Sequence, residues 1–180
     1  MSLTVTPGGA SDDALVTLAA FQAYCGDRGF DLAFIDVEQE QAIRRATVWV
    51  EAMGRPTGYL ATRWPGAKAS AAQRRAWPRA GATYTDGTAI PGDEIPPAVQ
   101  DAVCEVAFFD LSNPGQLNAA VTPSGVIKSE SVGNAGVKVE YQDGADMHAA
   151  RVMVVAAYDL LSGILKPDFR GPQAFIGSVG

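Results

Sequence analysis

The sequence is poor in the side chains that perform most enzyme chemistry. Its 180 residues include one histidine, His148, and two cysteines, Cys25 and Cys104, each within a helical apolar pattern. We interpret both cysteines as buried free thiols, which pack as small hydrophobic groups. A zinc site would need all three side chains and a fourth ligand, and their spacing matches no zinc pattern. No serine stands in a nucleophile-elbow setting that could use His148. We therefore expect no catalytic residues, no metal, no cofactor and no enzyme activity.

Long apolar runs and an excess of positive charge are also missing. The longest apolar candidate, residues 152–157, is far shorter than the roughly 18 residues of a membrane span, so we expect no membrane association. The N-terminus has no basic segment followed by an apolar run, which argues against a signal peptide. Fourteen basic and 20 acidic residues give a formal charge of −6. That balance argues against a protein whose function is to bind the phosphates of nucleic acid, although DNA could still pass nearby.

What the sequence does contain is apolar periodicity at helical spacing. Apolar residues from 14 to 25 recur on one face and predict a first helix, with Ser11 as its N-cap. Asp12 and Asp13 would then lie in the first turn, where the helix dipole favours negative charge. Gly26 and Gly29 end this helix.

A second apolar stripe, from residue 43 to 53, predicts a helix that begins at Asp36 and ends at Gly54. Asp36 and Gln39 resemble a capping box. The charged residues of this helix are expected to face solvent or a neighbouring subunit; they are Arg44, Arg45 and Glu51.

The second half of the chain predicts two further helices and a hairpin. Pro96 and Pro97 open a third helix that ends at Asn113. Alternating residues over 126–141, with a glycine-rich turn, predict a β-hairpin. A last helix is expected from about residue 145 to 162. The fold class is therefore mainly α: a small bundle of about four helices with an inserted β-hairpin and extended N- and C-terminal arms.

We divide the chain into a helical domain over residues 1–165 and a C-terminal arm over residues 166–180. The arm has no periodicity but is rich in apolar side chains, which are costly to leave in water. We therefore expect it to dock on another chain and to become ordered there. The docking residues are Phe169, Arg170, Phe175, Ile176 and Val179.

The long irregular stretch from 55 to 95 contains the most distinctive cluster, in which basic and aromatic residues interleave over 63–79. Three interpretations are open. Basic groups with aromatic platforms bind single-stranded nucleic acid; arginine and tryptophan are also enriched at subunit interfaces; and the two tryptophans could simply pack a core beneath a long loop. The acidity of the chain favours the interface over nucleic acid. The interface residues are then Trp64, Arg74, Arg75, Trp77 and Arg79.

Specific segments resemble a known family. The most specific are Ala76-Trp77-Pro78-Arg79, Asp86-Gly87 and Ile95-Pro96-Pro97-Ala98-Val99. Further similarity, in the same order along the chain, covers residues 24–29, 42–47, 102–107, 126–133 and 137–141. Together these segments resemble the phage neck proteins of the head–tail adaptor family. Sequences of that family often carry the label of DnaT-like single-strand DNA-binding proteins.

The resemblance implies a structural role in a tailed phage particle. It implies a helical core and a homo-oligomeric ring of about 12 copies beneath the portal protein, through which double-stranded DNA passes without specific binding. The arm would reach the portal. The hairpin, through Lys128, Glu130 and Asn134, would meet the next neck, stopper or tail protein. Made in the host cytoplasm, the protein would reside in the virion at the head–tail interface.

Within such a ring, we expect Arg74, Arg75 and Arg79 to pair with carboxylates of a neighbouring copy. The candidate partners are Asp93, Glu94 and Asp101. The alternative function, from a different class, is that of a single-stranded DNA-binding accessory protein of replication.

Overall fold

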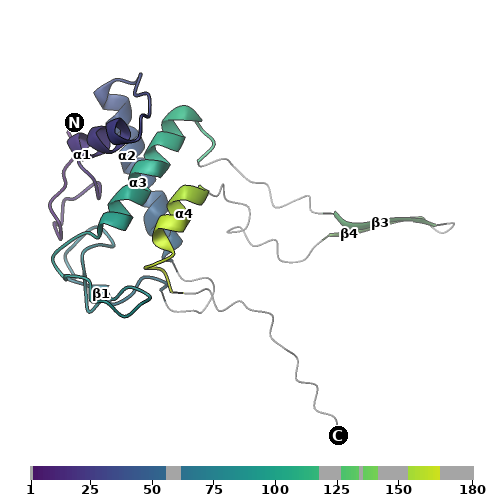
Figure 1. Cartoon of the computed structure of the whole chain (residues 1–180). Coiled ribbons are helices and arrows are strands. Elements are labelled where there is room, and N and C mark those ends of the chain that lie inside the picture. The colour runs from purple at the N-terminus through teal and green to yellow at the C-terminus, as the bar shows by residue number, and fades with distance from the viewer. Residues whose placement is uncertain (1, 56–61, 118–126, 134–135, 142–153, 167–180) are drawn as a thin grey trace, which may run out of the picture.

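Helices dominate the part of the chain that the structure describes (Figure 1). The computed structural model describes residues 2–55, 62–117, 127–133, 136–141 and 154–166. The helices are α1 (Leu18–Asp27), α2 (Asp36–Met53), α3 (Pro97–Ser112) and α4 (Val155–Leu161). The strands are β1 (Ala67–Lys68), β2 (Arg79–Ala80), β3 (Ile127–Gly133) and β4 (Gly136–Tyr141). The predicted fold class, mainly α with an inserted hairpin, is confirmed.

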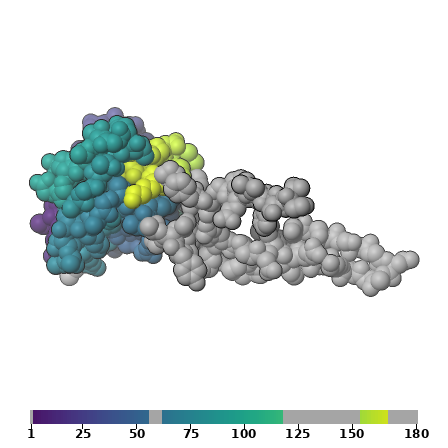
Figure 2. Space-filling view, turned by 90° about the horizontal axis from the view of Figure 1, so that it is seen from below, coloured from purple at the N-terminus to yellow at the C-terminus, as the bar shows by residue number. Residues whose placement is uncertain are grey.

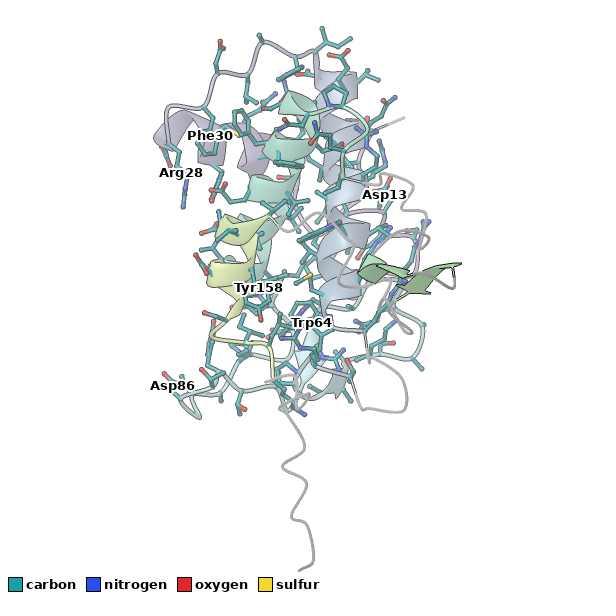
Figure 3. The ribbon with its side chains drawn as sticks, turned by 90° about the vertical axis from the view of Figure 1, so that its right-hand side faces the viewer. Asp13, Arg28, Phe30, Trp64, Asp86 and Tyr158 are labelled. Atoms are coloured by element: carbon teal, nitrogen blue, oxygen red, sulfur yellow. The ribbon has the colours of Figure 1, made fainter. Side chains whose placement is uncertain are left out.

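Helix α3 is the centre of the bundle and lies between α2 and α4 (Figures 1 and 3). Its sequence is suited to that place, because small and β-branched apolar residues occur around most of its circumference. Val99, Val103 and Val106 are fully buried, and Ala102 and Ala107 let neighbouring helices approach closely. Helix α1 contacts both α2 and α3. One continuous hydrophobic core therefore joins all four helices.

The first helix begins at Leu18, six residues later than predicted, with Thr17 and not Ser11 as its N-cap. The reason lies in the two aspartates expected in its first turn. Asp12 accepts from the backbone N–H groups of residues 6 and 9, at 2.7 and 3.0 Å, and Asp13 accepts from that of residue 4 at 2.8 Å. These side chains hold the N-terminal segment in a turn, and so compete with helix formation. The segment then packs on the core through Ala14, Leu15 and Val16, which are buried.

Helix α2 has the predicted bounds, but its N-terminus is built one residue away from the predicted capping box. Ile35 is the N-cap, and its N–H donates to the Glu38 carboxylate at 3.3 Å. The Gln39 amide instead donates to the carbonyl of Phe34 at 2.6 Å. At the other end, Gly54 is the C-cap, as the sequence indicated.

The charged residues of α2 only partly face solvent as expected: Arg45 is exposed, whereas Arg44 and Glu51 are half-buried, and all three contact other segments. Arg44 donates to Asp13 at 2.8 Å, and Arg45 forms an ion pair of 2.6 Å with the buried Asp110 of α3. Glu51 accepts from the Ala76 N–H at 2.7 Å. Long side chains at the edge of the apolar stripe thus connect α2 to other segments of the same chain.

The third helix and the hairpin have nearly the predicted bounds. Helix α3 has proline in its first turn and Asn113 as its C-cap. Strands β3 and β4 pair antiparallel, with Gly133 opposite Gly136 and Ile127 opposite Tyr141, and form a sheet of their own. An irregularity in the register lies between Ile127 and Ser129. The predicted hairpin is confirmed.

The last helix is shorter than predicted. Helix α4 comprises Val155–Leu161, and Val154 before it is extended, with φ −86° and ψ 97°. The expected start near residue 145, together with His148, lies outside the described residues. The apolar stripe that marked this helix is buried against the core at Ala157 and Leu161. None of the helices that the structure describes is long and apolar enough to cross a bilayer.

The junction between α2 and the following segment gives a test of the packing. A methyl group on Gly54 would fall on the indole ring of the buried Trp64. We expect Gly54→Ala to lower the free energy of unfolding by about 1–3 kcal/mol, because the ring has to move. Gly26→Ala is the matched control: its methyl group meets open space within α1, so the same change should stabilise by about 0.5–1 kcal/mol. Urea denaturation measures both values, and equal effects would contradict the packing.

Candidate functional site

The two tryptophans of the distinctive 63–79 cluster lie inside the protein. Trp77 is fully buried and Trp64 is 3% exposed, and their rings meet edge to face with centroids 5.7 Å apart. The indole N–H of Trp64 donates to the carbonyl of Glu51 at 3.3 Å, near the end of α2. The interpretation as core packing beneath a long loop is therefore confirmed. Neither ring is available to stack on a base.

Arg79 is also buried and works as a clip within the same segment. Its guanidinium group donates to three backbone carbonyls, those of Pro65 at 2.6 Å, Gly66 at 2.8 Å and Ala76 at 3.2 Å. Burial lowers the pKa of this group from its ordinary value. Since Arg79 stands in β2 opposite Lys68 of β1, the clip and the short sheet hold the same two stretches of chain together.

Arg75 ties the segment to two other parts of the fold. It donates to the carbonyls of Asp12 and Asp13, at 3.1 and 2.8 Å, and to the Glu51 carboxylate of α2 at 3.4 Å. Its side chain is buried, so this ion pair is shielded from water. The N-terminal turn, helix α2 and the 73–80 segment therefore meet at one guanidinium group.

These contacts correct the prediction that Arg75 and Arg79 pair with carboxylates of a neighbouring copy, whereas for Arg74 it stays a prediction. Arg75 and Arg79 are buried and hydrogen-bonded within their own chain. Of the five residues predicted for the interface, only Arg74 is exposed. Residues 73, 75, 77, 78 and 79 are all buried, and the chain bends at 74–76 and at 78, so no regular period in the sequence identified the inward side chains.

The outer side of α2 and this segment carries a surface that the sequence did not reveal. A hollow of about 350 Å³ lies between the middle of α2 and Arg74, and one of about 260 Å³ lies beside the end of α2. Arg74 lines both hollows, so they adjoin. Seven basic side chains line them, together with the carboxylates of Asp13 and Glu51. We call this surface the basic face, and its basic residues are Arg44, Arg45, Arg55, Lys68, Arg74, Arg75 and Arg79.

Arg55 and Arg74 are the cations of the basic face that are most available to a ligand. Both are exposed, and neither guanidinium group has a partner among the described residues. Arg44 and Arg45 are held in ion pairs with Asp13 and Asp110. A ligand with oxyanion groups, such as phosphate or carboxylate, fits such a surface best.

The two cysteines behave as predicted. Cys25 and Cys104 are free and buried. Burial raises the pKa of the Cys25 thiol to about 11, with a smaller contribution from the Glu105 carboxylate, and it raises the pKa of Cys104 as well. Both thiols are protonated at neutral pH, and a protonated thiol is a poor nucleophile. The ranges that the structure describes contain no cluster of three or more metal-ligating side chains.

The structure does not describe the side chains predicted for docking in the arm and the hairpin. Phe169, Arg170, Phe175, Ile176, Val179 and Asn134 lie outside the described residues. Lys128 and Glu130 belong to β3, of which only the backbone path is described. Their roles stay predictions.

Comparison with known proteins identifies the family. A model described as "Putative DnaT-like ssDNA binding protein" matches residues 1–176, so the chain belongs to that family. No curated protein and no solved structure matches the chain. Of the two expected functions, the family description names single-stranded DNA binding and not the phage neck.

The hydrogen bonds of Arg79 imply that this arginine stabilises the fold and that the exposed Arg74 does not. Arg79→Met removes the donor from one buried and two part-buried carbonyl hydrogen bonds, and we expect it to lower the free energy of unfolding by about 2–3 kcal/mol. Arg74→Met, the matched control on the exposed side of the same segment, should change it by less than about 0.5 kcal/mol. Denaturation followed by tryptophan fluorescence measures both. Equal losses for the two variants would show that the clip does not stabilise the fold.

Proposed function

We propose that this protein is a structural, non-enzymatic adaptor of a tailed phage particle, which joins the portal of the head to the tail. The observation that carries the proposal is the burial of Trp64 and Trp77, together with Arg75 and Arg79. The segment that carries the most specific part of the resemblance, residues 76–79, is thus part of the core. Its buried side chains fix the long loop to the helices. A rigid helical block with binding segments attached suits assembly between larger proteins.

The surface chemistry also favours contacts with protein over contacts with bases. Among the side chains whose burial the structure describes, which exclude those of the hairpin, every aromatic ring is buried or half-buried. Single-strand binders depend on aromatic platforms, each worth about 1–3 kcal/mol per stacked base. Without them, nucleic acid contacts would be limited to phosphates, and the chain carries a net charge of −6.

In this proposal the arm begins at a residue, Lys166, that is held to the folded part of the chain by two hydrogen bonds. Lys166 donates its N–H to the carbonyl of Arg63 at 2.9 Å, and the Arg63 side chain donates back to the Lys166 carbonyl at 3.1 Å. In the view from below, residues after 62 (blue) and α4 (yellow-green) form adjoining parts of one surface (Figure 2). An arm that starts from this pinned point would reach a portal site with a smaller loss of entropy than one attached by a free linker. Twelve such arms would add avidity.

Single-stranded DNA binding is the second candidate, favoured by the family description and by the basic face. Arg55, Lys68 and Arg74 could follow a phosphate backbone along the outer side of α2. Such binding would be insensitive to base sequence and strongly weakened by salt.

Removal of residues 167–180 tests the adaptor proposal. The truncation keeps Lys166 and its bonds to Arg63, so the helical body should retain its stability. We expect particles made with the truncated protein to package DNA but to fail to join tails stably. The matched control is the full-length Gln173→Ala variant, which leaves the apolar residues of the arm in place and should give normal titres. Normal infectivity of truncated particles would refute the docking arm.

Fluorescence anisotropy with labelled oligonucleotides at two salt concentrations separates the two candidates. The adaptor proposal predicts dissociation constants no tighter than the roughly 10⁻⁴–10⁻⁶ M of non-specific binding at physiological salt. Tight binding with a steep salt slope, lost in Arg55→Glu with Arg74→Glu, would favour the second candidate. The control is Lys166→Glu, which reverses one charge, half the change of the double variant, at an exposed position outside the basic face.

A further inference from the structure

Charge is distributed unequally between the two sides of the helical layer. The basic face lies on the outer side of α2, and α3 separates it from α4. Figure 3 shows this arrangement, with Asp13 beside α2 on one side of the helices and Arg28, Tyr158 and Asp86 on the other. The side away from α2 is therefore formed by α4, the end of α1 and the loop around residue 86.

That second side carries carboxylates, which we call the acidic face: Asp86, Asp101, Glu105 and Asp159. Asp86 is exposed, and its carboxylate is hydrogen-bonded to Thr88, whose N–H donates to it at 2.8 Å. Its loop lies against the end of α4, because the Thr85 N–H donates to the carbonyl of Gly163 at 2.8 Å. Asp159 is exposed on α4 and has no side-chain partner among the described residues.

The other two carboxylates of the acidic face share one cation. Arg28 lies 3.8 Å from Asp101 and 3.8 Å from Glu105, and Glu105 also accepts from the Tyr24 hydroxyl at 2.7 Å. The acidic face therefore keeps a surplus of negative charge, concentrated at Asp86 and Asp159.

The larger hollow of the basic face is lined by one exposed cation without an acceptor and by a buried tryptophan. The Arg74 guanidinium group is exposed at its edge, and the Trp49 side chain lines it. Trp49 is 3% exposed, and its indole N–H has no hydrogen-bond partner. An incoming carboxylate has enough lone pairs to accept from more than one N–H of the Arg74 guanidinium group.

We propose that this hollow receives a carboxylate from the acidic face of a second copy, so that copies of the chain associate head to tail. Asp86 and Asp159 are the carboxylates exposed for this contact. The inference rests on the proposed adaptor function and specifies which surfaces join neighbouring copies. A contact between two different faces repeats from copy to copy, and it closes into a ring where the rotation permits.

A second copy fits the hollow better than nucleic acid does. The complementary carboxylates lie on the same chain, on the opposite side of the helical layer, as a head-to-tail contact requires. Nucleic acid would bring phosphates to Arg74 but would find no exposed aromatic ring among the side chains whose burial the structure describes. Matched patches of opposite charge also set the register between partners.

Charge reversal on each face tests the proposal with the full-length protein. Sedimentation velocity over a concentration series should show mass rising with concentration for the natural sequence. Arg74→Glu, on the basic face, and Asp86→Lys with Asp159→Lys, on the acidic face, should each raise the dissociation constant at least about tenfold. An equimolar mixture of the two variants should associate again, because each offers the surface that the other has lost.

The matched control is Lys166→Glu, which makes the same change of charge outside both faces and should associate like the natural sequence. A natural chain that stays monomeric throughout, or a mixture that fails to associate, would overturn the head-to-tail contact. Binding of an oligonucleotide that is lost in Arg74→Glu would assign the hollow to phosphates and overturn it too. The adaptor function is judged separately, by the arm truncation in particles, so the two failures are distinguishable.

Discussion

The fold depends on one buried guanidinium group, that of Arg75. It binds the carbonyls of two N-terminal residues and the Glu51 carboxylate of α2, and it stands two residues before Trp77. Two segments with little regular structure of their own, the N-terminal turn and the 73–80 segment, are thereby fixed to α2. Because the donors are satisfied within the chain, the charge can remain in the interior, where an unpaired guanidinium group would be very costly. The position of Trp77 in the core follows from this attachment.

The burial of these side chains limits which surfaces of the protein can bind a partner. Tryptophans and arginines that alternate in a long loop suggest a binding site, yet most of them are used to build the loop into the body. What remains outside is a surface of charge: Arg55 and Arg74 on one side, and Asp86 and Asp159 on the other. A chain with a net charge of −6 can therefore still present a basic surface. Single-stranded DNA binding would use that surface to bind phosphates. The proposed contact between copies would use it to bind carboxylates.

The sequence predicted well those elements whose signals are local. Helices α2 and α3 are long, their apolar periodicity is regular, and Gly54, Pro97 and Asn113 mark their ends. The prediction was wrong where a contact with a distant segment determines the local structure. The start of α1 moved because Asp12 and Asp13 bind backbone donors of the N-terminal segment, a competition that helix periodicity does not register.

The candidate site was predicted only in part, for a related reason. Composition identified the basic and aromatic cluster, but whether Arg75 and Arg79 face inward depends on carbonyls and a carboxylate supplied by other segments. The contribution of α2 to the basic face was missed, because an apolar stripe shows which face is buried and not where long side chains reach.

The most direct measurement of the central claim is an electron cryo-microscopy reconstruction of the neck of purified particles. The account predicts a ring of helical density between portal and tail that accommodates α1 to α4, with Trp64 and Trp77 inside each subunit and the outer side of α2 against the next subunit. Complete, infectious particles that contain no copy of this chain would contradict the account.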